Sequence, residues 1–321
     1  MIMNKQYLDF KSILKNSALG PFLGLIGIYL LFAFIAPASF RSSANLQTMA
    51  RQSVIVGMAA IGMTLVIISG GIDLSVGSTI ALTTVIIAAL LQHWQWHPAA
   101  AALGGILAGG ITGLITGVLI TRLRMAPFIV TLGMMLIIRG AAKGLAGEQK
   151  IDAPMSALND LLATRPGWNW PAGVWMLLGL ALLMSLVLRY TVFGRHVVAV
   201  GSNPETARLC GIRVSLVRVG VYSLCGIFTG LAGLMQFSRL TVGDPTVAMG
   251  RELDVIAAVV IGGGSLTGGE GSIFGSLAGA MIMTVISNGC RQIGMANWIQ
   301  EIVTGGIIIL AVGLDRLRHR K

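Results

Sequence analysis

Asp73 is the only Asp, Glu, Lys or Arg between Arg51 and Arg122. It lies in the stretch "ISGGIDLSVGST" at 67–78, between two apolar runs. An ionisable residue at the centre of a bilayer costs at least about 2.5 to 3.5 kcal/mol, so such a residue is by default a candidate functional site. The chemistry available to this carboxyl group would be binding of a transported ion or relay of a proton.

The neighbours of Asp73 offer a second interpretation. Gly70 and Gly71 precede it and a new apolar run follows, as expected for a helix that stops and restarts. Its carboxylate would then cap the second helix by accepting hydrogen bonds from the amides of Ser75 and Val76. We expect this capping role, with the ion or proton site as the alternative.

Other catalytic and cofactor chemistry finds no support in the sequence. The pair Gly-Lys never occurs, so there is no phosphate-binding loop of the Gly-x-x-x-x-Gly-Lys-[Ser/Thr] type. His93 and His97 flank "WQW", which favours aromatic anchoring at a membrane surface over metal binding. No nucleophile with its base and no paired acids emerge. We therefore expect neither an enzyme nor a bound cofactor or metal.

The composition predicts what the surrounding elements are. Of 321 residues, 55% are hydrophobic and 11% charged, with a mean hydropathy of +0.83; soluble domains carry about a quarter charged residues. The 43 glycines indicate helices that pack closely in a membrane. The net charge of +11 is spread over short loops, which favours membrane topology over nucleic-acid binding.

These features predict one all-α transmembrane domain over 1–321, with about ten membrane-spanning helices and glycine-rich breaks. The basic residues favour cytoplasmic N and C termini, with 1–17 as a cytoplasmic segment, 189–216 as a cytoplasmic loop and 315–321 as a basic cytoplasmic tail. The apolar runs place the spans at 18–37, 52–70, 74–92, 98–120, 125–146, 172–188, 217–237, 254–265, 270–288 and 301–314.

The eighth span is short, because "GGGSLTGGEGS" at 262–272 follows only about ten apolar residues. It contains Gly263, Gly264 and Glu270, and we expect a helix break there like the one at Asp73. Transporters place broken helices at such segments, but a tilted span with flexible glycines is equally compatible. In the fifth span, Arg139 and Lys143 lie four residues apart. We expect both to extend to the outer surface, with lining of a polar path as the alternative.

Four segments in order resemble the ribose-type permeases, the membrane subunits of bacterial ATP-binding cassette (ABC) sugar importers. They are "GMTLVIISGGIDLSVGS" at 62–78, "FIVTLGMMLIIRG" at 128–140, "VYSLCGIFTGLAGL" at 221–234 and "ELDVIAAVVIGGGSLTGGEGS" at 252–272. The resemblance implies import of ribose or a similar monosaccharide across the bacterial inner membrane. It also implies an ABC ATPase that supplies the ATP chemistry, a periplasmic sugar-binding protein and a second permease copy, expected to be identical.

The loop at 189–213 contains local signals for a short helix of about seven residues. Asn203 suits the N-cap, Pro204 the first helical position, Glu205 the positive helix end and Gly211 the stop. The resemblance implies that this is the coupling segment for the ATPase, with contacts that include Arg208 and Leu209.

The loops at 148–170 and 238–254 are the expected docking surfaces for the sugar-binding protein. The residues that touch the sugar cannot be named from the sequence. The alternative function is an ion-coupled secondary carrier for a small polar solute, with Asp73 as its coupling site.

Overall fold

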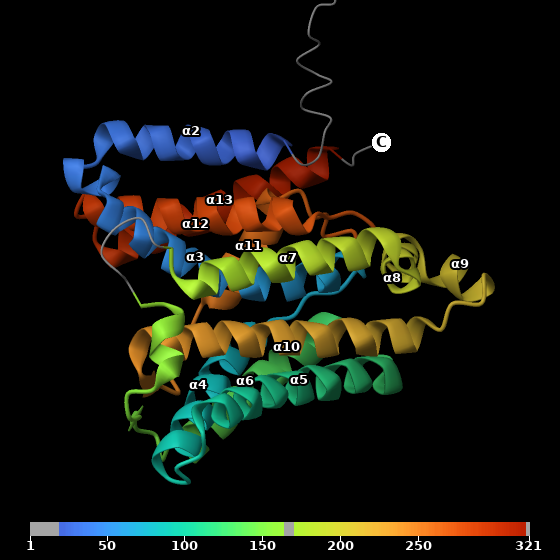
Figure 1. Cartoon of the computed structure of the whole chain (residues 1–321). Coiled ribbons are helices and arrows are strands. Elements are labelled where there is room, and N and C mark those ends of the chain that lie inside the picture. The colour runs from blue at the N-terminus through green and yellow to red at the C-terminus, as the bar shows by residue number, and fades with distance from the viewer. Residues whose placement is uncertain (1–18, 164–169, 319–321) are drawn as a thin grey trace, which may run out of the picture.

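The structure is a computed structural model that describes residues 19–163 and 170–318. The predicted N-terminal segment 1–17 and residues 319–321 of the predicted tail lie outside the described residues. Long helices dominate, stacked side by side along one direction (Figure 1). They are α2 (Leu19–Ile35), α3 (Ser43–Ile68), α4 (Val76–Gln92), α5 (Pro98–Leu123), α6 (Pro127–Leu145), α7 (Ala172–Tyr190), α10 (Val214–Leu240), α12 (Ile273–Gln292) and α13 (Asn297–Arg318). The shorter α11 (Arg251–Ile261) lies between α10 and α12 in the sequence.

Short elements join them. These are the 3₁₀ helices η1 (Ala38–Arg41) and η2 (Ala157–Leu161), the short helices α8 (Val192–Ser202) and α9 (Pro204–Leu209), and the two-residue strands β1 (Ile151–Asp152) and β2 (Val242–Gly243). The strands pair antiparallel, Ile151 opposite Gly243, and the prediction of an entirely helical chain missed this contact.

Each of the ten predicted apolar runs overlaps one helix of the structure, although several boundaries differ. The largest difference is at α3, which begins at Ser43 and not at 52 because the Ser42 side chain accepts a hydrogen bond from the amide of Asn45. Six of the described helices are long and apolar enough to cross a membrane: α3, α5, α6, α7, α10 and α12. The apolar helices α2, α4 and α13 are shorter by this measure, and α11 has only 11 residues.

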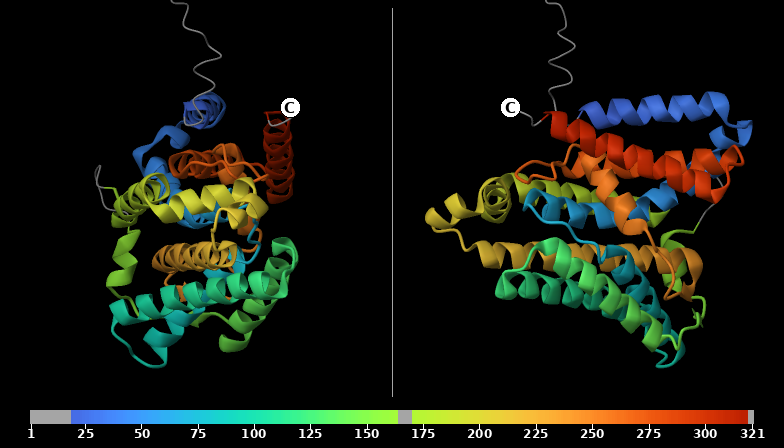
Figure 2. Two further views of the ribbon diagram at one scale, coloured as in Figure 1. Left: turned by 90° about the vertical axis from the view of Figure 1, so that its right-hand side faces the viewer. Right: turned by 180° about the vertical axis from the view of Figure 1, so that it is seen from behind.

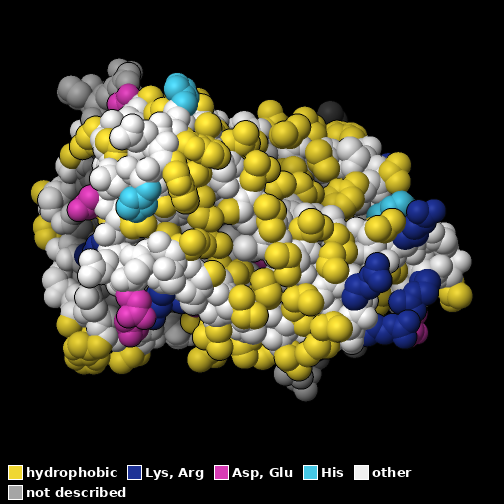
Figure 3. Space-filling view, turned by 90° about the horizontal axis from the view of Figure 1, so that it is seen from below, with side chains coloured by type: hydrophobic (Ala, Val, Ile, Leu, Met, Phe, Trp, Pro, Cys, Tyr) yellow, Lys and Arg dark blue, Asp and Glu magenta, His cyan; other side chains and the backbone are white. Residues whose placement is uncertain are grey.

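The centre of the molecule is α3. In its most apolar window 89% of the residues are buried, compared with 22% in α7. Apolar side chains on the outer helices remain exposed and form a broad surface between the two ends of the molecule (Figure 3). Such a surface fits the hydrocarbon of a bilayer and would be an aggregation hazard in water.

Helices α5 and α10 approach closely through glycines. A Cβ on Gly109 of α5 would lie 2.9 Å from the Cα of Gly230, and one on Gly113 would lie 3.0 Å from the Cα of Gly226. These glycines are four residues apart on each helix, the spacing that lets helices in membranes pack backbone to backbone. At this interface the glycines have the close-packing role that the composition suggested.

The two ends of the stack differ in charge. Lys and Arg side chains gather at the end that carries α8 and α9, and Figure 3 shows Asp and Glu at the other end. The starting residue of α2 and the last turn of α13 also lie at the α9 end (Figures 1 and 2). This end is called the basic end below.

Candidate functional site

The first glycine break separates α3 from α4. Gly70 has a left-handed backbone with φ of +78°, and α4 restarts at Val76. Asp73 is 3% exposed, and its Oδ1 accepts hydrogen bonds from the amide (2.8 Å) and the hydroxyl (2.6 Å) of Ser75. The N-cap is Ser75, so the carboxylate stabilises the turn before the helix and does not cap the helix directly.

Side chains from two other helices hold this break in place. Thr131 of α6 donates its hydroxyl to the carbonyl of Ile72 at 3.2 Å, and Tyr222 of α10 donates to the same carbonyl at 3.4 Å. Gly71 leaves room for the Tyr222 hydroxyl, which a Cβ at that position would collide with. Side chains of α6 and α10 therefore fix the conformation of the break between α3 and α4.

The second glycine break separates α11 from α12. It begins with Gly262, continues through Gly263 with φ of +89° and Gly264, and ends where the Ser272 side chain caps α12. Glu270 lies in this segment, and its backbone carbonyl accepts a hydrogen bond of 3.1 Å from the amide of Ser265.

The two breaks touch each other and touch α8. The amide of Gly269 donates to the carbonyl of Ile68, the last residue of α3, at 2.8 Å. A Cβ on Gly201 of α8 would lie 2.7 Å from the Gly269 nitrogen, and one on Gly268 would lie 3.1 Å from the Cα of Gly70. Three backbones far apart in sequence therefore meet here. We call Ile68, Gly70, Gly201, Gly268 and Gly269 the glycine junction.

The short helix α9 follows α8 directly at the basic end. Asn203 is its N-cap, and the side-chain oxygen accepts from the amides of Glu205 and Thr206, both at 3.0 Å. Pro204 occupies the first helical position as predicted. The helix has six residues, close to the expected seven.

A hydrogen-bonded stop ends α9. Gly211 has φ of +83°, its amide donates to Arg208, and the amide of Ile212 donates to Ala207, each at 3.0 Å. This is the Schellman pattern that a glycine after a helix permits. Ala207 faces the protein, whereas the side chain of Leu209 is 88% exposed.

The connection from α10 to α11 is irregular and runs alongside α4. Gly243 packs against Thr84 and Ala88 of α4, and Ala248 lies against Gly77, so the segment follows about 11 residues of that helix. At 1.5 Å per residue this is about 16 Å, roughly half the hydrocarbon thickness. Helix α11 thus starts beside the beginning of α4, which accounts for its short length. This geometry corresponds to the broken-helix alternative and not to a tilted full-length span.

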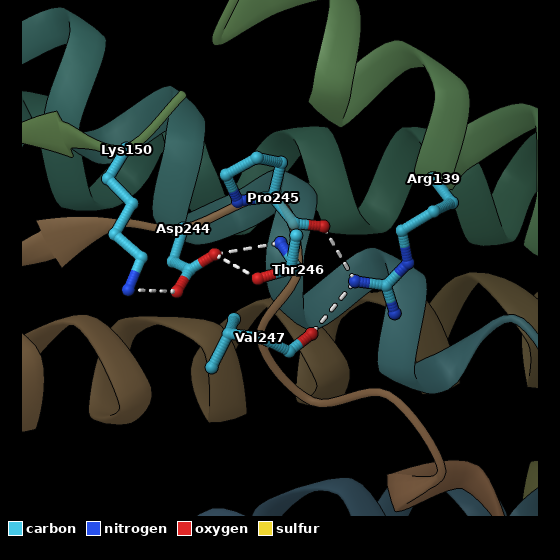
Figure 4. Close-up of polar contacts among 6 residues, drawn as sticks. All are labelled: Arg139, Lys150, Asp244, Pro245, Thr246 and Val247. Atoms are coloured by element: carbon cyan, nitrogen blue, oxygen red, sulfur yellow. Dashed lines mark hydrogen bonds and ion pairs between the residues drawn. The ribbon is translucent and has the colours of Figure 1, made fainter. Parts of the chain in front are cut away.

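Arg139 holds this irregular segment. Its guanidinium group donates to the carbonyl oxygens of Pro245 and Val247, both at 2.8 Å (Figure 4). The expectation that Arg139 extends to the outer surface is therefore wrong, because two carbonyls without helical partners draw it inward. Lys143, one turn further along α6, is exposed.

Asp244 fixes the start of the same segment. Its Oδ1 accepts from the amide (2.8 Å) and hydroxyl (2.6 Å) of Thr246, and its Oδ2 lies 3.2 Å from the Lys150 ammonium (Figure 4). Burial raises the pKa of Asp244, but the Thr246 bonds and Lys150 outweigh it, so the pKa lies below its usual value. The loop at 238–254, expected as an outer docking surface, is thus largely engaged with the protein's own helices.

Comparison with known proteins identifies the family. Residues 45–312 match the family described as the permease component of the branched-chain amino acid transport system. The chain belongs to this family of transport permeases. It is thus a membrane transport component and not an enzyme.

The permease is similar over nearly its full length to three sugar transporters. It is 40% identical to the ribose import permease of Bacillus subtilis (93% of this chain, 92% of that protein). It is 36% identical to the L-arabinose ABC transporter permease of Azospirillum brasilense, over 93% of this chain and 88% of that protein. It is 35% identical to the fructose import permease of Rhizobium meliloti, over 94% of this chain and 86% of that protein.

Several contacts between distant parts of the permease could not be predicted from its sequence. Gly201 carried no signal of its own, because its partners Ile68 and Gly269 lie 133 and 68 positions away in sequence. The contacts of Arg139 are with the carbonyls of Pro245 and Val247, which lie 106 and 108 residues further along the sequence. Among the side chains that the structure describes, no three His, Cys, Asp or Glu residues are placed to hold a metal ion.

Proposed function

We propose that this permease is the membrane-spanning subunit of an ATP-binding cassette importer that carries ribose or a similar monosaccharide into the cytoplasm. The similarity to permeases for ribose, L-arabinose and fructose over at least 92% of this chain supports this proposal. A soluble sugar-binding protein would deliver the substrate, and a separate ATPase would bind and hydrolyse ATP. The functional unit would contain two copies of the permease in the bacterial inner membrane.

In this proposal ten segments cross the membrane, the eighth of them as the irregular α10–α11 connection followed by the short α11, and the basic end is cytoplasmic. The excess of Lys and Arg at that end supports the orientation. A reporter fused after Lys321 should then be cytoplasmic, and one inserted near Pro154 should be external. Finding both reporters on the same side would contradict the ten-segment topology.

Helix α9 would be the coupling element for the ATPase, through Asn203, Pro204, Glu205, Arg208, Leu209 and Gly211. It projects from the basic end (Figure 1), and an 88% exposed Leu209 suits an apolar groove on a partner. Because α8 connects α9 to the glycine junction, a displacement of α9 would act on both broken helices at once. ATP binding would thereby shift the population between inward-open and outward-open states.

The experiment is isolation of the intact complex followed by reconstitution in vesicles. We expect ATPase chains and a second permease copy to co-purify, and labelled sugar to enter only with ATP and the binding protein present. An ion-coupled carrier would instead transport without any ATPase and would stop when the ion gradient collapses. That result would overturn the proposal.

A further inference from the structure

A groove at the basic end is lined by five arginines. It has a volume of about 900 Å³ and lies between the α5–α6 connection and the start of α10. The arginines are Arg122, Arg124, Arg208, Arg213 and Arg218, and no acidic residue lines the groove. None of the five forms an ion pair with the residues that the structure describes. The groove therefore concentrates positive charge that the protein itself leaves uncompensated.

Helix polarity explains only part of this cluster. Arg122 and Arg208 lie in the last turns of α5 and α9, where a cation is favourable. Arg213 lies instead at the N-cap of α10, where a cation is unfavourable and an anion is favoured. Arg218 lies one turn further along the same helix. An anion bound between these side chains would offset the unfavourable position of Arg213.

The helix starts beside the groove add to the same field. Both α6 and α10 begin at this end, neither has an acidic residue in its first turn, and neither N-cap side chain accepts a hydrogen bond. The amide of Val214 at the start of α10 donates to the carbonyl of Ile212, and α6 begins with Pro127, which has no N–H. Only the remaining amides of these first turns can attract an anion and reinforce the arginines. The combination is suited to a phosphate group.

The surroundings of the groove indicate which kind of molecule would carry the phosphate group. Ile120, Met125, Ile212 and Val214 share the lining with the arginines. The exposed face of α5 next to it is apolar and includes Leu107, Ile111, Leu114 and Val118. Figure 3 shows the Lys and Arg side chains of this end directly beside apolar surface. In a membrane the groove would therefore lie at the boundary between hydrocarbon and water, at the level of the lipid headgroups.

We propose that this groove binds the phosphate headgroup of an anionic phospholipid from the cytoplasmic leaflet. Basic pockets between membrane helices on that side are suited to such headgroups. The phosphate would lie among Arg124, Arg213 and Arg218, with the acyl chains along α5 and α6. The exposed Leu209 of α9 is not part of the lining, whereas Arg208 of the same helix is, so the groove and the proposed ATPase contact adjoin at Arg208. The variants that test the groove therefore leave Arg208 unchanged.

The test uses the full-length permease alone, in vesicles of phosphatidylcholine with a minor fraction of phosphatidylglycerol. Native mass spectrometry measures how strongly the protein retains phosphatidylglycerol over phosphatidylcholine. The variant is Arg124→Gln with Arg218→Gln, and the matched control is Arg189→Gln with Arg195→Gln, two exposed arginines of the same end outside the groove. We expect selectivity in the wild type and the control, and a loss of roughly 10-fold in the groove variant.

Equal selectivity in the groove variant and the control would overturn the proposal, because general surface charge would then account for retention. Competition by inorganic phosphate at millimolar concentration would assign the site to a free anion and would also overturn it. A separate co-purification of the groove variant with the ATPase provides a second readout. Loss of the ATPase with unchanged lipid retention would overturn the proposal and assign the groove to an acidic protein surface. If the double variant does not purify, Arg124→Gln alone provides the same test, with Arg124→Lys expected to retain selectivity.

Discussion

The amide of Gly269 donates a 2.8 Å hydrogen bond to the carbonyl of Ile68. This bond joins the second glycine break to the end of α3, the most buried of the six long apolar helices. Gly201 lies against both partners and belongs to α8, the helix before α9. A chain of backbone contacts therefore connects an exposed surface helix to two breaks in the membrane bundle.

Gly201→Ala tests this junction. The added Cβ would collide with the Ile68 carbonyl and lie 2.7 Å from the Gly269 nitrogen, and neither backbone can yield cheaply. We expect a loss of about 1 to 3 kcal/mol in the free energy of unfolding, measured by denaturant titration in detergent, and weaker sugar-stimulated ATP hydrolysis. Gly179→Ala in α7 is the control, since its Cβ would have nothing within 4 Å. Equal effects of the two variants would show that the junction tolerates displacement.

Arg139→Gln tests the role of this side chain in the α10–α11 segment. It removes charge-assisted hydrogen bonds to Pro245 and Val247, so we expect a loss of roughly 2 kcal/mol in the free energy of unfolding and reduced uptake. Lys143→Gln removes the same charge one turn away at an exposed position and should change stability by less than about 0.5 kcal/mol. Matching stability losses in both variants would mean that the carbonyl contacts contribute nothing.

Part of this architecture could be predicted from the sequence because it is local. The signals for α9 lie within nine consecutive residues, Asn203 to Gly211, and its caps follow from short-range hydrogen bonds. The glycine breaks could be predicted because glycines interrupt the apolar runs at these positions. The inward direction of Arg139 and the meeting of Gly201 with Gly269 depend on tertiary packing, and local pattern carries no information about it.

Two substitutions of Asp73 distinguish a structural role of this residue from an ion-coupling role. Asp73→Asn keeps a side-chain oxygen that can accept the Ser75 hydrogen bonds, so we expect most transport to remain. Asp73→Ala removes the acceptor and should lower the free energy of unfolding by roughly 0.5 to 2 kcal/mol. Uptake of labelled sugar and thermal unfolding measure the two effects. Complete loss of uptake in a well-folded Asp73→Asn protein would favour the ion or proton relay.

Leu209→Asp tests α9 as the contact for the ATPase. The side chain is 88% exposed in the isolated chain, so a charge there costs the permease fold little but would be buried without a partner in an apolar groove of the ATPase. We expect weaker ATPase co-purification and less substrate-stimulated ATP hydrolysis in reconstituted vesicles. Pro204→Gly should have a milder effect, because it loosens only the start of the helix.

The matched control for Leu209→Asp is Met155→Asp, an equally drastic change at a residue that is 82% exposed in the loop before η2. In the proposed topology Met155 lies on the external side, so this variant should keep the ATPase bound. It would instead reduce the response to the sugar-binding protein if the loop at 148–170 is a docking surface. Wild-type ATPase association and hydrolysis in Leu209→Asp would exclude Leu209 as a coupling contact, and coupling would then have to act through other residues at the basic end.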